Sequence, residues 1–146
     1  MKPRDTVDFH IKSAWHHISK IYNEQAAPYG STAATGFVLL NINAKEGSPV
    51  TSIGPALGME PGSLSRILKN LEKEGLIQRI QDETDKRLVR VFLTDKGKKL
   101  RAVARETVTL FNEKIREEIS AEKLAVFFEV MDKIHGVIQK KNIYNQ

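Results

Sequence analysis

Apolar residues recur at helical spacing near the start of the chain. Steps of three, four and seven residues describe one stripe of an amphipathic helix, made of Val7, Ile11, Ala14, Trp15, Ile18, Ile21 and Tyr22. This pattern predicts a helix from Thr6 to Gln25, with Asp5 or Thr6 as its N-cap and an end before Pro28. A second helix is predicted to begin at Ser31 or Thr32 and to stop at Gly47-Ser48-Pro49.

Two further helices are predicted in the middle of the chain. A short one spans Ser52 to Leu57 with Thr51 as its cap, although Gly54 and Pro55 weaken it. After a turn, Pro61 stands at a favoured first helical position, and a helix is expected from Gly62 to Glu74. Its buried stripe is Leu64, Ile67, Leu68 and Leu71.

The pattern then changes to two short strands, Leu76 to Gln81 and Leu88 to Leu93, joined by a polar tip at 82–87. Hairpin tips usually turn on Gly or Asn, whereas this one carries mostly charged residues, Asp82, Glu83, Asp85, Lys86 and Arg87. Such a tip is either a solvated hairpin end or a surface directed at a charged partner.

Two helices are predicted to complete the chain. Thr94 can cap a long helix to Ile119, which at about 1.5 Å per residue is close to 40 Å long. Ser120 can cap a last helix. A chain of 146 residues offers little globule for such helices to bury against, so a dimer interface built from both chain ends is expected. The fold class predicted is mainly α (α+β).

Composition narrows the class of protein. The length of 146 residues suits one domain, and the absence of Cys excludes disulfides and thiolate metal sites. No apolar run approaches the about 20 residues of a membrane span, so a cytoplasmic protein without a membrane partner is expected.

The net charge of +5 is concentrated in one segment. Residues 63–101 hold eleven basic and six acidic residues, while the acidic and basic residues on either side balance. A localised excess of this kind suggests a face offered to a polyanion.

The predicted order of elements is helix, turn, helix and a two-stranded wing. This is the order of a winged helix-turn-helix, a fold whose shape allows it to bind DNA. A helix with small residues at its start and basic ones further along fits the major groove, while a basic wing tip reaches backbone or minor groove. The predicted DNA contacts are Ser63, Ser65, Arg66, Lys69, Asn70, Asp85, Lys86 and Arg87. Asp85 is expected to orient the Arg87 guanidinium by a charge-assisted bond. Arg79 and Arg90 either contact DNA or pair with wing acids.

The segments Pro61–Arg79, Asp85-Lys86-Arg87 and Leu93-Thr94-Asp95-Lys96-Gly97 together resemble the MarR family of bacterial transcription regulators. The resemblance covers residues 1–146 as a single MarR-type domain. It implies a winged DNA-binding lobe at 31–94 and a helical dimerisation lobe at 1–30 and 95–146. It also implies a homodimer on a pseudo-palindromic double-stranded DNA operator, usually a repressor relieved by a small, often anionic or aromatic molecule. Gly54-Pro55 and the lack of Cys depart from the family pattern.

An effector pocket is predicted where the dimerisation helices meet the DNA-binding lobe, with Trp15, Tyr22, Phe37 and Phe111 as candidates. Aromatic residues at helical spacing can equally be core.

Other functions are weighed against the regulator. One alternative is a zinc-responsive regulator, since the chain contains four histidines, His10, His16, His17 and His135. However, no His-x-x-x-His pair occurs, and no metal site or cofactor is expected. No phosphate loop, metalloprotease motif or activated nucleophile is present, so an enzyme is not expected. A winged helix that binds protein rather than DNA is the remaining alternative.

Overall fold

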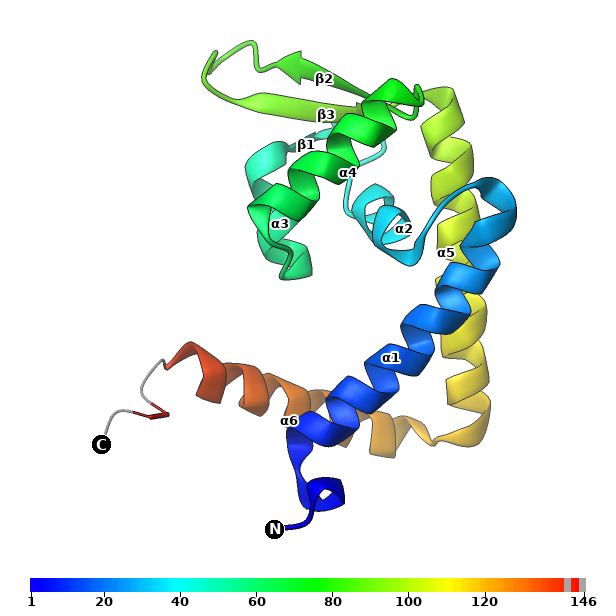
Figure 1. Cartoon of the computed structure of the whole chain (residues 1–146), viewed down its shortest axis with the longest axis vertical. Coiled ribbons are helices and arrows are strands. Elements are labelled where there is room, and N and C mark those ends of the chain that lie inside the picture. The colour runs from blue at the N-terminus through cyan, green and yellow to red at the C-terminus, as the bar shows by residue number, and fades with distance from the viewer. Residues whose placement is uncertain (141–142, 145–146) are drawn as a thin grey trace. The chain divides into compact units, whose positions relative to one another are not determined.

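The structure, a computed structural model, describes residues 1–140 and 143–144 (Figure 1). The chain divides into two compact units, Met1–Val108 and Thr109–Gln146. In chain order the elements are α1 (Val7–Ala26), α2 (Ala33–Leu40), β1 (Ser48–Pro49), α3 (Val50–Leu57), α4 (Pro61–Lys73), β2 (Ile77–Gln81), β3 (Val89–Leu93), α5 (Asp95–Glu118) and α6 (Ala121–Gln139), with 3-10 turns at Pro3–Asp5 and Ala27–Tyr29. Helices dominate beside one small sheet, which confirms the predicted fold class.

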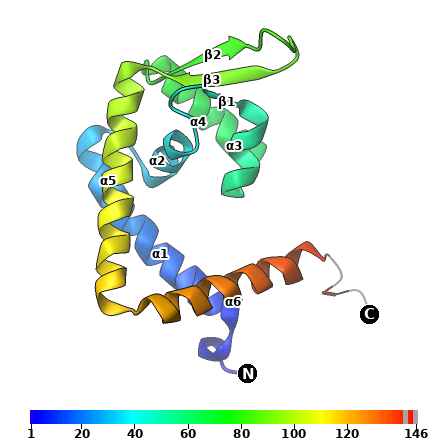
Figure 2. The same ribbon diagram turned by 180° about the vertical axis from the view of Figure 1, so that it is seen from behind.

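The winged helix-turn-helix of the first unit is visible from both sides (Figure 1, Figure 2). After α3, Gly58 takes a left-handed conformation with φ 59°, which turns the chain into α4. Gly75, with φ 71°, turns it again into the β2–β3 hairpin. The hairpin is antiparallel, with Arg79 opposite Val91 at its centre.

The sheet has a third strand that the sequence did not predict. Its order is β1-β3-β2, and the two residues of β1 pair antiparallel with Val91 and Arg90 of β3. Two residues, one of them Pro49, are too few to show a strand period. Pro49 is tolerated because β1 is an edge strand.

One hydrophobic core holds the winged unit together. Buried side chains from α2, α3, α4 and the sheet form it: Val38, Leu39, Ile42, Ile53, Leu64, Leu68, Leu71, Leu76, Ile77, Val91 and Leu93. Leu64, Leu68 and Leu71 are the stripe of α4, so the opposite face of that helix is left to solvent.

The second helix is shorter than predicted, because α2 ends at Leu40 rather than at Gly47. The Asn43 side chain explains this early end: its Oδ1 accepts hydrogen bonds from the backbone N–H groups of Lys45 and Glu46, at 2.9 and 3.0 Å. Asparagine that bonds to nearby backbone competes with helix continuation.

The third helix begins two residues earlier than predicted, at Val50, with Pro49 rather than Thr51 at its N-cap. Gly54 has a packing role within α3. A Cβ at Gly54 would lie 3.2 Å from Leu64 Cδ2, so the missing side chain lets α3 and α4 pack closely. This contact accounts for glycine at a position that departs from the family pattern.

The first turn of α5 packs directly on the chain between α4 and β2. Thr94 caps the helix as predicted, since its Oγ1 accepts from the Gly97 N–H at 3.1 Å and also donates to the Gly75 carbonyl at 2.6 Å. A Cβ at Gly97 would lie 1.9 Å from the Leu76 carbonyl oxygen. Only glycine therefore fits at this crossing.

In the second unit, Ser120 caps α6 as predicted, because its Oγ accepts from the Lys123 N–H at 3.4 Å. No residue of α6 is buried.

Candidate nucleic-acid interface

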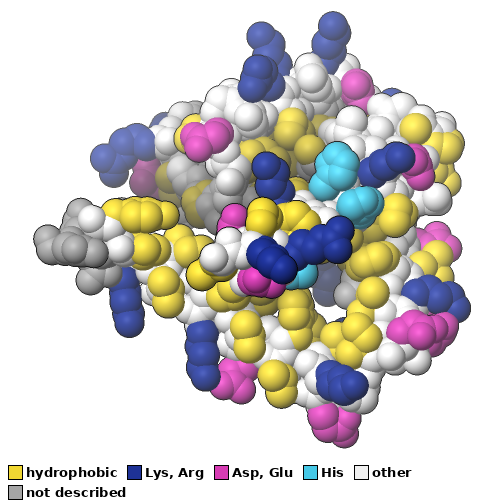
Figure 3. Space-filling model, turned by 60° about the horizontal axis from the view of Figure 1, so that its bottom comes forward, with side chains coloured by type: hydrophobic (Ala, Val, Ile, Leu, Met, Phe, Trp, Pro, Cys, Tyr) yellow, Lys and Arg dark blue, Asp and Glu magenta, His cyan; other side chains and the backbone are white. Residues whose placement is uncertain are grey.

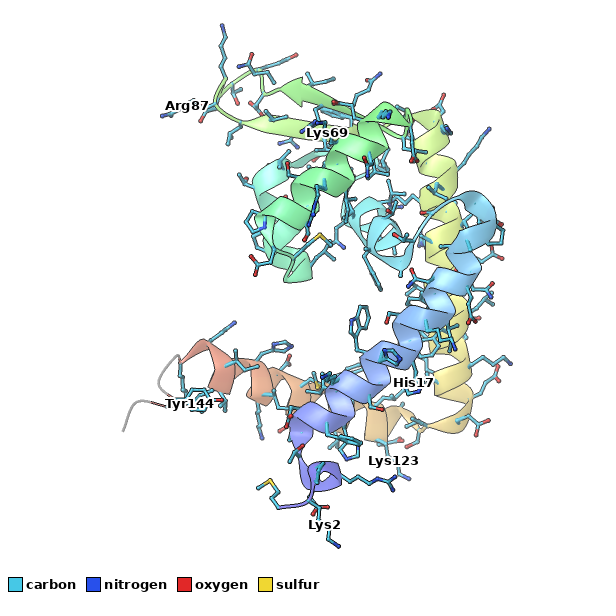
Figure 4. The ribbon with its side chains drawn as sticks, in the orientation of Figure 1. Lys2, His17, Lys69, Arg87, Lys123 and Tyr144 are labelled. Atoms are coloured by element: carbon cyan, nitrogen blue, oxygen red, sulfur yellow. The ribbon has the colours of Figure 1, made fainter. Side chains whose placement is uncertain are left out.

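The outer face of α4 carries five of the predicted DNA contacts. Ser63 is partly exposed, and the other four are exposed: Ser65, Arg66, Lys69 and Asn70. Arg66 donates from a terminal nitrogen to Ser63 Oγ at 3.4 Å, which is a weak contact. Lys69 is labelled on α4 in Figure 4. The face is open, with small side chains near the helix start and cations one turn later.

Asp82 builds the wing tip. Its Oδ1 accepts three hydrogen bonds, from Thr84 Oγ1 at 2.6 Å, Thr84 N–H at 2.9 Å and Asp85 N–H at 3.1 Å. The Asp82 N–H donates to the Leu88 carbonyl at 2.8 Å and closes the loop. This carboxylate therefore takes the structural place that Gly or Asn fills in shorter hairpins.

Asp85 holds Arg87 by two contacts. Its Oδ1 accepts from the Arg87 backbone N–H at 3.0 Å and from Arg87 Nε at 3.3 Å. The Arg87 side chain nevertheless remains 91% exposed and lies at the wing tip (Figure 4). The guanidinium is restrained at Nε while its terminal nitrogens stay open to solvent. Lys86 is also exposed.

The side chains of Arg79 and Arg90 are bonded to other parts of the winged unit. Arg79 pairs with Glu72 of α4 through two hydrogen bonds, at 3.1 and 3.2 Å, and so ties β2 to α4. Arg90 lies 3.8 Å from Asp82 and donates to the carbonyls of Glu46 and Gly47. Only Arg90 pairs with a wing acid, whereas the partner of Arg79 lies on the helix before the wing.

These contacts lower the pKa of two carboxyl groups, those of Asp82 and Glu72. The Thr84 hydroxyl, the backbone N–H groups of Asp85 and Thr84, and the Arg90 charge lower the pKa of Asp82. Hydrogen bonds from Arg79 lower the pKa of Glu72. Both groups are thus held in the ionised form in which they accept hydrogen bonds.

The wing tip is expected to lose its order only in acid. A lowered pKa means that the folded wing binds protons less readily, so its stabilisation is present above the ordinary Asp pKa of about 3.9 and is lost as pH falls through the lowered value. The protection of the Thr84 and Asp85 amides from exchange, relative to an unstructured peptide at the same pH, should stay constant from pH 8 to 5. Asp82→Ala should speed exchange at all pH values, whereas Asp82→Asn, which keeps an acceptor, should do so less. Equal exchange in the two variants would contradict the role of the Asp82 acceptor.

A cavity in the first unit brings together two of the four predicted pocket residues. Tyr22 of α1 and Phe37 of α2 line it, with ring centroids 5.9 Å apart. Trp15 lies outside the lining, but its ring packs on Phe37 at 5.7 Å. Phe111 lies in the second unit. The long helix was expected to form one wall, but its lining residues, such as Leu100, were missed, although the helical spacing of 100, 103, 104, 107 and 108 marks one face.

The histidines do not form a cluster. His10 Nε2 lies 2.7 Å from the Arg4 carbonyl and His17 Nδ1 lies 2.7 Å from the Ser13 carbonyl, so both rings bond locally. Among residues 1–140 and 143–144, no group of three or more His, Cys, Asp or Glu is placed to hold a metal ion.

These elements define a winged helix-turn-helix protein, and comparison with known proteins gives its family. The MarR family model matches residues 32–89. The transcriptional regulator SarZ of Staphylococcus epidermidis is 30% identical over 106 residues, which cover 72% of this chain and 70% of SarZ. The transcriptional regulator TtmR of Methylorubrum extorquens is 37% identical over 93 residues, which cover 64% of this chain and 48% of TtmR. The chain thus spans about half the length of TtmR.

Solved structures agree on the fold. A Staphylococcus aureus MepR–DNA complex superposes with a TM-score of 0.82 at 21% identity, covering 90% of this chain and 98% of MepR. The PcaV regulator of Streptomyces coelicolor, in complex with its natural ligand, superposes with a TM-score of 0.78 at 18% identity, covering 93% and 96%.

The chain belongs to the MarR family. Its relatives SarZ and TtmR are transcriptional regulators rather than enzymes. No helix within the described residues is long and apolar enough to cross a membrane.

Proposed function

We propose that this protein is a homodimeric, sequence-specific repressor that binds a pseudo-palindromic operator and releases it when a small molecule enters the cavity of the first unit. The observation that carries the DNA-binding role is the wing tip. There Asp82 and Asp85 are engaged in holding the loop and Arg87, while Lys86 and the guanidinium end of Arg87 remain exposed. Such a regulator acts on cytoplasmic DNA.

The proposed DNA contacts divide into two groups. Ser63, Ser65, Arg66, Lys69 and Asn70 on α4 suit the major groove, where Arg and Lys read guanine and Asn reads adenine. Lys86 and Arg87 suit the backbone or the minor groove, and Asp85 positions Arg87. Phosphate contacts fix the register of a protein on DNA, while base contacts supply the specificity.

The dimer is proposed from the apolar surface of α6. Phe127, Val130 and Val137 follow one another at helical spacing, yet each is close to half exposed. Hydrophobic side chains also lie open on the face drawn in Figure 3. An exposed apolar stripe of this kind is typical of a protein–protein interface. Two-fold symmetry would place two α4 helices in major grooves about 34 Å apart.

A charge placed in this stripe is expected to dissociate the dimer. Phe127→Glu would bury an unpaired carboxylate in the interface, which should weaken self-association by at least about tenfold. Sedimentation over a concentration series measures the change. Lys133→Ala on the same helix removes only an exposed ion pair with Glu129, so it should leave the dimer intact. An unchanged dimer in Phe127→Glu would place the interface elsewhere.

The regulatory part of the proposal rests on where the cavity lies. Its walls come from α1, α2 and α5, and α2 also contributes Val38 and Leu39 to the core under α4. A ligand that binds one arrangement of these helices more tightly shifts the DNA-binding equilibrium by that difference alone. The test is operator release. Small molecules that stabilise the protein against thermal unfolding are added to a protein–operator complex. Retention of the operator with every such molecule would refute the ligand-responsive role.

A further inference from the structure

The cavity of the first unit is lined without any charged residue. None of its fourteen lining residues is Lys, Arg, His, Asp or Glu. Most of the wall is aliphatic or aromatic, including Phe37, Leu40, Leu100 and Val103. A carboxylate taken from water into such a wall loses its hydration and gains no cation in return.

Two of the hydroxyl groups in the wall are already engaged. Thr107 Oγ1 donates to the Val103 carbonyl of its own helix at 3.0 Å. Thr32 Oγ1 accepts from the Thr35 N–H and donates to Thr35 Oγ1, both at 3.2 Å, where it caps α2. These hydroxyls therefore add little capacity to solvate a negative charge.

Two basic residues follow a lining residue in sequence: Arg105, after Ala104, is exposed, and Arg101 is held by a hydrogen bond. Arg101, next to Leu100, donates from Nε to the Leu39 carbonyl at 3.2 Å and so holds the end of α2. It is not part of the cavity wall. Turning it toward a ligand would remove this bond.

The pKa of one residue of the cavity wall, Tyr22, shows how burial disfavours a negative charge there. Desolvation raises the pKa of the Tyr22 phenol above its ordinary value of 10.0. An anion is therefore disfavoured at this wall, as expected where no cation compensates for lost water.

We infer that this cavity selects a small, uncharged, mainly apolar ligand, such as a neutral single-ring aromatic, over a carboxylate of the same shape. The space open to the centre of a water molecule is about 40 Å³. A single water needs about 10–15 Å³ by that measure, so the cavity suits a compact molecule. The inference rests on the proposed function only for its biological use, because the binding preference itself is a property of the wall.

Benzamide and benzoate test this preference, since they share a ring and a planar head group and differ in charge. Calorimetry at pH 7.5 should show benzamide binding at least about tenfold more tightly than benzoate. Trp15 is the only tryptophan and packs on the wall residue Phe37, so its fluorescence reports binding independently. Benzoate binding as tightly as benzamide, or no binding of benzamide in the millimolar range, would overturn the inference.

Two variants locate the effect in the cavity. Thr107→Lys introduces a cation into the wall and should reverse the preference in favour of benzoate. Thr109→Lys introduces the same charge at an exposed position of α5 that does not line the cavity, and should leave the preference unchanged. Should Thr107→Lys fail to fold, Val103→Phe, which fills the cavity with an apolar ring, must abolish benzamide binding. Benzamide binding retained in Val103→Phe would place the site elsewhere.

Operator release separates this inference from the proposed function. Benzamide could bind in preference to benzoate and leave the operator bound. That result would support the ligand preference and contradict a regulatory response to benzamide. If benzoate binds better and releases the operator, regulation stands and the inference of an uncharged ligand fails.

Discussion

Replacing Gly97 by Ala is expected to destabilise the protein by at least about 3 kcal/mol, the upper range for overpacking. The added Cβ would lie 1.9 Å from the Leu76 carbonyl oxygen and 2.9 Å from its carbonyl carbon. Both partners are backbone, so no side chain can rotate away. The first turn of α5 and the chain between α4 and β2 would have to separate, and the bonds of Thr94 to Gly75 and Gly97 would be lost with them.

Denaturant unfolding at constant protein concentration measures this loss. Gly62→Ala is the matched control: Gly62 also lies in the first turn of a helix, but a Cβ there would have no neighbour within 4 Å. That variant should be equally stable or slightly more so, since Ala favours the helix over Gly. A loss below about 1 kcal/mol in Gly97→Ala would show that the elements separate readily in solution.

Replacing Arg87 by Ala is expected to weaken operator binding by about 1.5–3 kcal/mol for each protomer of the dimer, or about 10- to 150-fold per half-site. The side chain is 91% exposed, and its bond to Asp85 is on the surface. The loss of affinity should therefore come without a change in unfolding free energy. Lys114→Ala removes another exposed cation, one paired with Glu117 in the second unit, and should bind as the wild type does. Wild-type affinity in Arg87→Ala would refute DNA contact by the wing.

Asp85→Ala distinguishes positioning from simple electrostatics. Removing a negative charge beside DNA should strengthen binding if only net charge matters. If Asp85 orients Arg87, its loss frees the guanidinium and weakens binding, though by less than Arg87→Ala. Fluorescence anisotropy with the same operator and the same salt compares the two variants directly. Tighter binding by Asp85→Ala would leave the carboxylate without an orienting role.

The parts of the fold with a clear hydrophobic period were predictable from sequence. The stripe of Leu64, Leu68 and Leu71 placed α4 to within one residue at each end, and Thr94 and Ser120 were identified as caps by residue type. The end of α2 was not predictable, because Asn43 bonds to the backbone only once the following turn exists. The strand β1 was missed for a related reason: two residues form a strand only through their pairing with β3.

The candidate DNA-binding surface was also predictable in part. Charge along the chain and the order of elements marked α4 and the wing, and residue type alone suggested that Asp85 contacts Arg87. The partner of Arg79 was not predictable in this way, since Glu72 lies on the preceding helix and approaches only after the hairpin has formed. The lining residues of the cavity were least predictable, because most of them are ordinary core types.

Cations of α4 and the wing are proposed to bind DNA phosphates and bases, and such contacts make DNA binding depend on salt concentration. If Arg66, Lys69, Lys86 and Arg87 of both protomers contact phosphate, the logarithm of the binding constant should fall against the logarithm of salt concentration with a slope of about −7. In Arg87→Ala the slope should become shallower by about two. Anisotropy titrations between about 50 and 200 mM salt measure both slopes. A wild-type slope near zero, or one unchanged in Arg87→Ala, would contradict this account of the interface.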